Sequence, residues 1–283
     1  MPPRRQPTAR QVRLGAELRK LREAAGLKAT EAASLLGVNS VQMSQMESGI
    51  AGVSEERLRC LAAHYACPDA ELLSALVAMA TGRTHGWWEE YRGALPNSFL
   101  DLSELEHHAS FRWDVDFLHV PGLLQTADYA HALFAYVNPD FPDSERARRV
   151  EHRMRRRAVI ERPEPVPYTA VIHEAALRIR VGSRPASRAQ LNRILEISEA
   201  DGVTVRVIPF DLDGFGGAGS AMVYAGGPVP QLDTVVRDGP NGTVFIDAAA
   251  QLGHFRTLFH RVKTASLGPE RSRDFIHTLA KEL

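Results

Sequence analysis

The chain has 283 residues, with 34 basic and 34 acidic side chains and 44% hydrophobic residues. This length suggests two domains at roughly 100–200 residues each. The longest apolar run, at 72–80, is about half the ~20 residues needed to cross a bilayer, and the N-terminus shows no hydrophobic signal segment. Two cysteines, Cys60 and Cys67, are too few for a disulfide framework or a structural zinc site. We therefore expect a cytoplasmic protein without membrane segments.

A first helix is predicted from Thr8 to Gly26. Thr8 and Gln11 have the spacing of a capping box, and leucines then recur on one face at 14, 18 and 21. Gly26 suits the left-handed position that ends a helix. Gly15, in the middle of the helix, either permits a close helix approach or is simply tolerated.

Two further short helices follow, separated by a turn with a glycine. The first covers about 29–36 and ends at Gly37, and the second begins at Asn39 with Gln42 at the reciprocal capping position. Gly49 closes the second helix. Two short helices joined by such a turn have the geometry of a helix-turn-helix.

The second of these helices has two distinct faces. At 100° per residue Met43 and Met46 point inward, whereas the outward face is small, polar and uncharged. Gln45 on this face suits adenine, and Val41 suits a thymine methyl group. We expect base contacts from Ser40, Val41, Ser44 and Gln45, and phosphate contacts from Lys28, Thr30, Asn39 and Gln42. The alternative is a helical bundle retained for protein contacts.

The basic charge gathers at the N-terminal edge of the chain. Within residues 4–28, eight basic residues face two acidic ones. This cluster predicts a salt-dependent attraction to DNA phosphates.

The segment 14–66 resembles the Xre, or lambda-repressor-like, helix-turn-helix family. The resemblance lies in LRKLREAAGL, LLGVNS and MSQMESG. It implies that Arg22 and Glu47 form a structural ion pair and do not read DNA. Lys28 stands where the family usually has Ser or Thr, and Ala32 where it usually has Leu.

The remainder of the chain mixes helices and strands. TGRTHG at 81–86 predicts a hinge, and 102–114 and 120–137 are expected to be largely helical. Strands are predicted near 168–174, 203–210, 219–225, 234–237 and 242–247, and helices near 186–200, 248–265 and 269–282. We expect a mainly α N-terminal bundle of about five helices, followed by an α+β domain with a largely antiparallel sheet. The expected parts are 1–80 for DNA binding, a helical linker at 81–165, and a ligand- or partner-binding domain at 166–283.

The segment VPGLLQTADYA at 120–130 carries a second resemblance. It is similar to the hallmark of actinobacterial Xre-type regulators that have a C-terminal domain of unknown function and include antitoxin-like members. RVEHRMRRR (149–157), AVIHEAALRIRVG (170–182) and VTVRVIPF (203–210) agree with it. His173 departs from the Asp expected before Glu174. The resemblance implies a small partner protein encoded by a neighbouring gene.

Other candidate sites have plainer explanations. The segment 146–157 holds seven arginines, but the chain has 30 Arg and only 4 Lys, so a solvated helix face is favoured over a second DNA contact or a groove for an acidic partner. DGFGGAG at 213–219 matches a dinucleotide-binding pattern but precedes a strand, so we expect a hairpin loop. We find no catalytic motif, convincing metal set or cofactor site.

The sequence therefore predicts a DNA-binding transcriptional regulator, whose expected partners are double-stranded DNA and a second copy of the chain. Its C-terminal domain would sense an unidentified small-molecule effector or bind a partner protein. The alternatives are an enzyme or a protein-interaction platform that the DNA-binding domain merely localises.

Overall fold

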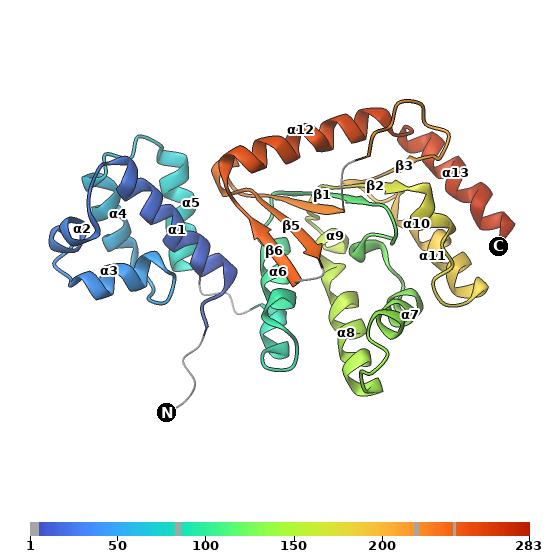
Figure 1. The fold of residues 1–283 in the computed structure, drawn as a ribbon, viewed down its shortest axis with the longest axis horizontal. Helices are drawn as coiled ribbons and strands as arrows, with labels where there is room; N and C mark the ends of the chain where they lie inside the picture. Colours follow the sequence, from blue (N-terminus) through green and yellow to red (C-terminus); the bar gives the residue numbers. More distant parts are fainter. Residues whose placement is uncertain (1–5, 83–85, 218–220, 240–241) are drawn as a thin grey trace. The chain divides into compact units, whose positions relative to one another are not determined.

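The computed structural model describes residues 6–82, 86–217, 221–239 and 242–283. Its contacts divide the chain into two compact units, Met1–Leu105 and Glu106–Leu283, here termed unit 1 and unit 2 (Figure 1). Residues 83–85 of the predicted hinge lie outside the described residues. So do 218–219 of the glycine-rich loop and 219–220 of the predicted strand at 219–225.

Unit 1 begins with the five helices that the sequence predicts. They are α1 (Ala9–Ala24), α2 (Ala29–Leu35), α3 (Ser40–Glu47), α4 (Glu55–His64) and α5 (Ala70–Thr81). Thr8 and Gln11 form the predicted capping box at the start of α1. Gly26, Gly37 and Gly49 have φ angles of 71°, 67° and 75°, the left-handed conformation that glycine adopts without strain.

The backbones of α1 and α3 approach closely at Gly15. A Cβ atom added to Gly15 would lie 2.6 Å from the carbonyl oxygens of Met46 and Glu47. Gly49 makes a similar approach, because its added Cβ would lie 2.6 Å from the carbonyl oxygen of Gln11. The glycine inside the first helix therefore has a packing role.

Unit 1 extends beyond residue 81. A 3₁₀ helix (Trp87–Tyr91) and most of α6 (Asn97–His107) follow α5. Trp88, Tyr91, Leu95 and Leu100 are buried against one another. The Asp101 carboxylate accepts a hydrogen bond from the Ala9 N–H at 2.9 Å, so the start of α1 is held by a segment far along the chain.

Unit 2 contains a six-stranded sheet in the order β3-β2-β1-β4-β5-β6. The strands are β1 (Phe111–Asp116), β2 (Tyr168–His173), β3 (Val203–Ile208), β4 (Met222–Gly226), β5 (Thr234–Gly239) and β6 (Gly242–Ile246). β1–β2 and β2–β3 pair parallel, while the other three neighbouring pairs are antiparallel. The sheet is mixed, and the expectation of a largely antiparallel sheet is wrong.

The parallel half follows from the helices between its strands. α7 (Ala127–Val137), α8 (Asp143–Arg156) and α9 (Ala158–Glu161) connect β1 to β2, and α10 (Glu174–Arg178) and α11 (Arg184–Ile197) connect β2 to β3. Long crossovers of this kind return the chain to the same end of the sheet, as parallel pairing requires. α12 (Ala249–Ala265) and α13 (Pro269–Glu282) complete the unit.

Strand β1 replaces part of a predicted helix. The sequence predicts a largely helical segment at 102–114, but α6 ends at His107 and β1 begins at Phe111. In FRWDVD (111–116) apolar and charged residues alternate, which is the period of a strand. The charged residues Arg112 and Asp114 are buried. This strand therefore does not have the solvent-exposed polar face that usually accompanies such alternation.

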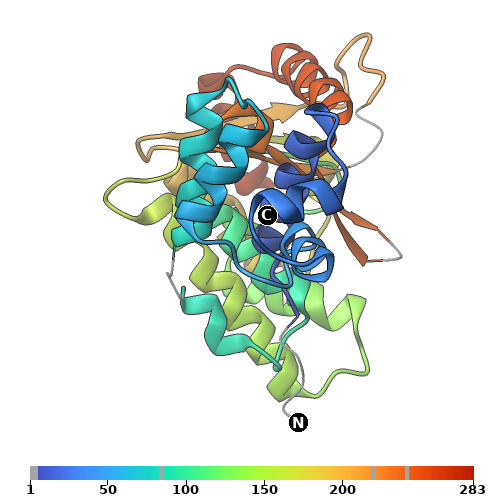
Figure 2. The same ribbon diagram turned by 90° about the vertical axis from the view of Figure 1, so that its left-hand side faces the viewer.

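The two faces of the sheet differ in chemistry. α12 crosses one face, where Phe259 and Val262 pack with Val115, Tyr224 and other buried strand residues. α8 lies on the opposite side of the sheet from α12 (Figures 1 and 2). The α12 face is therefore an apolar core, whereas the α8 face carries the charged residues of β1.

Candidate nucleic-acid interface

The turn between α2 and α3 is fixed by its own side chains and backbone. The Asn39 side chain accepts the Gln42 N–H at 2.8 Å, and the Gln42 side chain accepts the Asn39 N–H at 3.1 Å. The Val38 N–H donates to Ala33 O at 2.9 Å. The start of α3 is thus capped within the turn. Asn39 and Gln42 are both exposed.

Helix α3 is anchored by its methionines. Met43 and Met46 are only 1% and 4% exposed, whereas Val41 is 63% exposed. Ser40 and Ser44 are also exposed, and Gln45 is half-buried. The four residues predicted to read bases are therefore uncharged and at least partly exposed.

The residues predicted at the flanking phosphates lie at the start of α2. Lys28 and Thr30 are both exposed. The Lys28 backbone N–H donates to the Glu31 carboxylate at 2.6 Å at the start of α2.

Arg22 and Glu47 form a buried ion pair between the ends of α1 and α3. Arg22 donates from Nε and Nη2 to the two Glu47 carboxylate oxygens at 2.6 and 3.0 Å, and from Nη1 to Leu27 O at 2.7 Å. The bonded carboxylate raises the pKa of Arg22. Because this pair is buried inside unit 1, it joins the end of α3 to α1.

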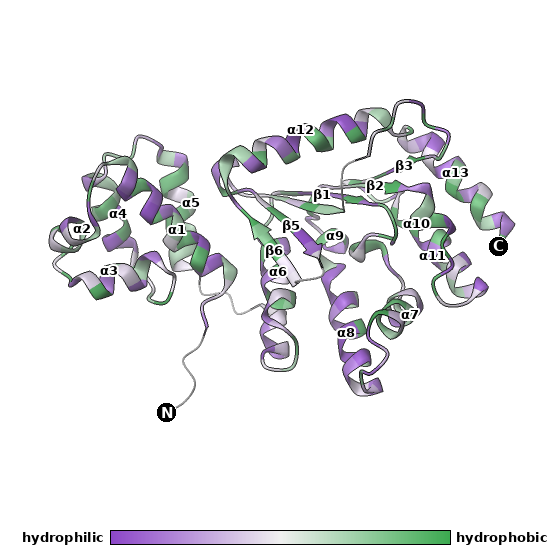
Figure 3. Ribbon diagram, in the orientation of Figure 1, coloured by the Kyte–Doolittle hydropathy of each residue, from purple (hydrophilic) through white to green (hydrophobic). Residues whose placement is uncertain are grey.

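The arginine-rich segment 146–157 forms most of α8, which is strongly hydrophilic along its length (Figure 3). The preferred interpretation of this segment as a solvated face is wrong for Arg149, His152 and Arg156, which are 9%, 1% and 5% exposed. α8 turns part of its charged face toward the sheet.

These inward charges belong to a cluster that the sequence does not reveal. Arg156 donates to both Glu106 oxygens at 2.8 and 2.6 Å, and Arg112 donates to both Asp114 oxygens at 2.8 and 2.9 Å. Arg112 also pairs with Glu106, and the Tyr168 hydroxyl donates to Asp114 at 2.8 Å. We call these five residues the buried ion cluster. Two guanidinium groups balance two carboxylates within it.

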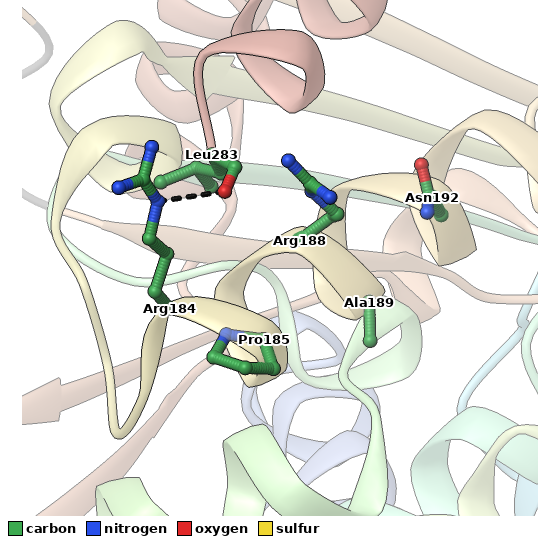
Figure 4. Close-up of a pocket in the computed structure, with 6 residues that line it drawn as sticks. All are labelled: Arg184, Pro185, Arg188, Ala189, Asn192 and Leu283. Carbon is green, nitrogen blue, oxygen red and sulfur yellow. Dashed lines mark hydrogen bonds between the residues drawn. The ribbon is translucent and has the colours of Figure 1, made fainter.

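Other features of unit 2 give weaker indications of a functional site. A hollow of about 310 Å³ is lined by Arg184, Pro185, Arg188, Ala189, Asn192 and Leu283 (Figure 4). Arg184 donates there to the backbone oxygens of Leu283 and Glu282 at 2.6 and 2.7 Å, so this arginine is already engaged. His173 caps α10 by accepting the Ala175 N–H. Within the described residues, no three His, Cys, Asp or Glu side chains are grouped so that they could hold a metal ion.

The geometry of α2 and α3 defines a helix-turn-helix protein. A family model described as a helix-turn-helix domain matches residues 13–76, which agrees with that class. The chain belongs to the family defined by the domain of unknown function DUF5753, whose model matches residues 99–278. No curated protein and no solved structure matches the chain. None of the described helices has the length and apolar character needed to cross a membrane.

Proposed function

We propose that the protein is a sequence-specific transcriptional regulator of the Xre type that inserts α3 into the major groove of DNA. The observation that carries this proposal is the exposed, uncharged face of α3 opposite buried Met43 and Met46. Ser40, Val41, Ser44 and Gln45 would contact bases. Lys28, Thr30, Asn39 and Gln42 would contact phosphates and set the register.

The proposal includes a homodimer acting on a pseudo-palindromic site. Two α3 helices would then enter successive major grooves about 34 Å apart. We propose 1–80 as the DNA-binding part, 81–165 as a helical connection, and 166–283 as the part that senses a small ligand or binds a small partner protein. An antitoxin-like pairing and a location on the nucleoid belong to the same proposal.

Selection of genomic DNA fragments by the purified protein tests the assignment of α3. We expect enrichment of a pseudo-palindrome, because its two halves would meet the two copies of α3. Gln45→Ala should weaken binding to this site by roughly 1–3 kcal/mol and relax the choice at one base pair.

The matched control is Gln251→Ala, which truncates an exposed glutamine on α12 in unit 2. This variant should select the same sequence as the unaltered protein. Unchanged sequence preference in Gln45→Ala would show that α3 does not read bases through this residue.

A further inference from the structure

The sheet of unit 2 has two edge strands, β3 and β6, and the free edge of β3 is covered. The segment between α12 and α13 lies against it, because the Leu267 N–H donates to Val207 O at 2.8 Å and the Val207 N–H donates to Ser272 Oγ at 3.0 Å. Arg206 adds a side-chain contact, since its Nε donates to Ser266 Oγ at 2.9 Å. This edge is therefore blocked where the Val207 backbone faces outward.

The opposite edge of the sheet, β6, is open. In an antiparallel ladder, alternate residues direct their N–H and C=O groups away from the neighbouring strand. Within the described residues, β6 pairs with β5 alone, and no backbone hydrogen bond joins it to any other segment (Figure 1). β6 thus presents unpaired backbone donors and acceptors on its outer side.

β6 also lacks the devices that usually keep an edge strand from pairing with another chain. Natural edge strands carry lysine, proline, an inward-pointing charge or a bulge. The sequence of β6 is GTVFI at 242–246, without a charged residue or a proline. Its pairing with β5 runs from Gly242 to Ile246 without a bulge. The strand is therefore suited to accept a further strand.

Val244 gives this edge an exposed apolar side chain. It lies opposite Arg237, whose guanidinium lies over the Phe255 ring of α12 with 5.8 Å to the ring centre, so Val244 belongs to the α12 face of the sheet. Ile246, two residues further on the same face, packs against the apolar core, whereas Val244 is 55% exposed. A second strand beside β6 would cover Val244.

A second copy of β6 fits this edge. Two identical antiparallel strands are related by a twofold axis, so each presents the same surface to the other. Like charges that face each other across strands destabilise a pair, but β6 carries no charge. The register with the longest overlap pairs Val244 with Val244 of the partner subunit and Thr243 with Phe245 of the partner subunit. Such β-branched and aromatic cross-strand pairs stabilise sheets.

We propose that β6 pairs with β6 of a second copy of the chain, so that the two sheets continue as one across the dimer interface. The inference rests on the proposed homodimer and assigns its interface to this strand. It does not depend on base contacts by α3. Because two short strands form a smaller interface than the standard size, dimer formation should depend on protein concentration.

Sedimentation velocity of the full-length protein without DNA tests the proposal. Protein concentrations from about 1 to 300 µM cover the range in which small interfaces associate. We expect the fraction of dimer to rise across this range. A protein that stays monomeric throughout it overturns the proposal.

Charge substitution at Val244 tests the strand itself. Val244→Lys and Val244→Glu should each weaken dimer formation by about tenfold or more, because two like charges would meet at the axis. An equimolar mixture of the two variants should form dimers again, because each lysine then faces a glutamate. Dimer formation by Val244→Lys at the unaltered level, or a mixture that stays monomeric, contradicts the assigned pairing. Circular dichroism would verify that each variant is folded.

A cysteine at the axis gives a second readout, which decides the question if the charged variants fail to fold. Paired residues of antiparallel strands have Cα atoms about 4.5–5.5 Å apart, which a disulfide can span. Val244→Cys should therefore form a covalent dimer on air oxidation, seen on non-reducing gels, beyond any cross-linking of the unaltered protein through Cys60 and Cys67. The matched control is Tyr136→Cys on α7, at a position that is 88% exposed. Equal cross-linking of the two variants would indicate random collision and overturn the proposal.

Failure of this interface is distinguishable from failure of the proposed DNA binding. The oligomeric state is measured without DNA, whereas genomic selection with Gln45→Ala reports on α3. A monomeric protein that still selects a DNA sequence would overturn the β6 interface and leave base reading by α3 intact. A dimer that is lost in Val244→Lys but selects no sequence would support the interface and contradict the role of α3.

Discussion

At the scale of single residues, Gly15 shows how the absence of a side chain positions a helix. Replacing it with alanine would place a Cβ 2.6 Å from the Met46 and Glu47 carbonyl oxygens. These are backbone atoms, so α1 and α3 must separate. We expect Gly15→Ala to lower the free energy of unfolding by about 1–3 kcal/mol, typical of overpacking, as measured by denaturant titration.

Gly253→Ala provides the control for this prediction. Gly253 also lies within a helix, but an added Cβ would meet no atom within 4 Å. Alanine there should increase stability by roughly 0.5–1 kcal/mol through helix propensity. If Gly15→Ala also increased stability, the close approach of α1 and α3 would not exist in solution.

At the scale of elements, α2 and α3 were predictable because their signals are local. The capping box of Asn39 and Gln42 and the left-handed Gly37 each involve only a few consecutive residues. The sequence could also place Met43 and Met46 inward from helical periodicity alone. The helix-turn-helix was therefore accessible without any knowledge of the rest of the chain.

The sheet and the buried ion cluster were not predictable in the same way. Tyr168 and Asp114 are 54 positions apart, and Arg156 and Glu106 are 50 apart. Nothing in the local pattern indicates such pairings. Arg156 on α8 resembled part of a solvated face because its carboxylate partner, Glu106, lies on another element. The parallel pairing of β1 with β2 likewise depends on a long connection.

Helix α2 also allows a prediction about salt dependence. If Lys28 at its start neutralises one phosphate, then Lys28→Ala should weaken binding to all DNA sequences alike. The slope of log K against log salt concentration should become shallower by about 1 per half-site contact. Fluorescence anisotropy with a specific and a random duplex measures this effect.

Lys281→Ala, which removes an exposed lysine from α13, is the control for general charge effects. An equal change in slope for Lys281→Ala would mean that net charge, not a Lys28–phosphate contact, governs the attraction.

At the scale of the whole molecule, acid should act on unit 2 through His152. Burial, reinforced by the arginines of α8, lowers the pKa of His152 from 6.5 to about 3. The unfolded chain therefore binds a proton below about pH 6.5 that the folded chain does not bind. This contribution to stability is complete above that pH and is lost as the pH falls, at up to about 1.4 kcal/mol per pH unit.

Thermal unfolding of the full chain between pH 7 and pH 4.5 checks this expectation. His152→Gln, which cannot titrate, should show a weaker loss of stability in this range. Trp113→Phe identifies the transition of unit 2, since Trp113 lies in that unit whereas Trp87 and Trp88 lie in unit 1. Identical pH profiles with and without His152 would show that this side chain is protonated equally in the folded and unfolded states.

The buried ion cluster also limits how this sequence can change over time. Losing one of its charges would strand an opposite charge in the interior, at a cost of about 3–5 kcal/mol, whereas apolar side chains in place of the whole set can be tolerated. Each single-step path away from Glu106, Arg112, Asp114 and Arg156 therefore passes through a poorly folded intermediate. Related sequences should consequently keep all four residues or replace all four at once, so substitutions at these positions should be correlated.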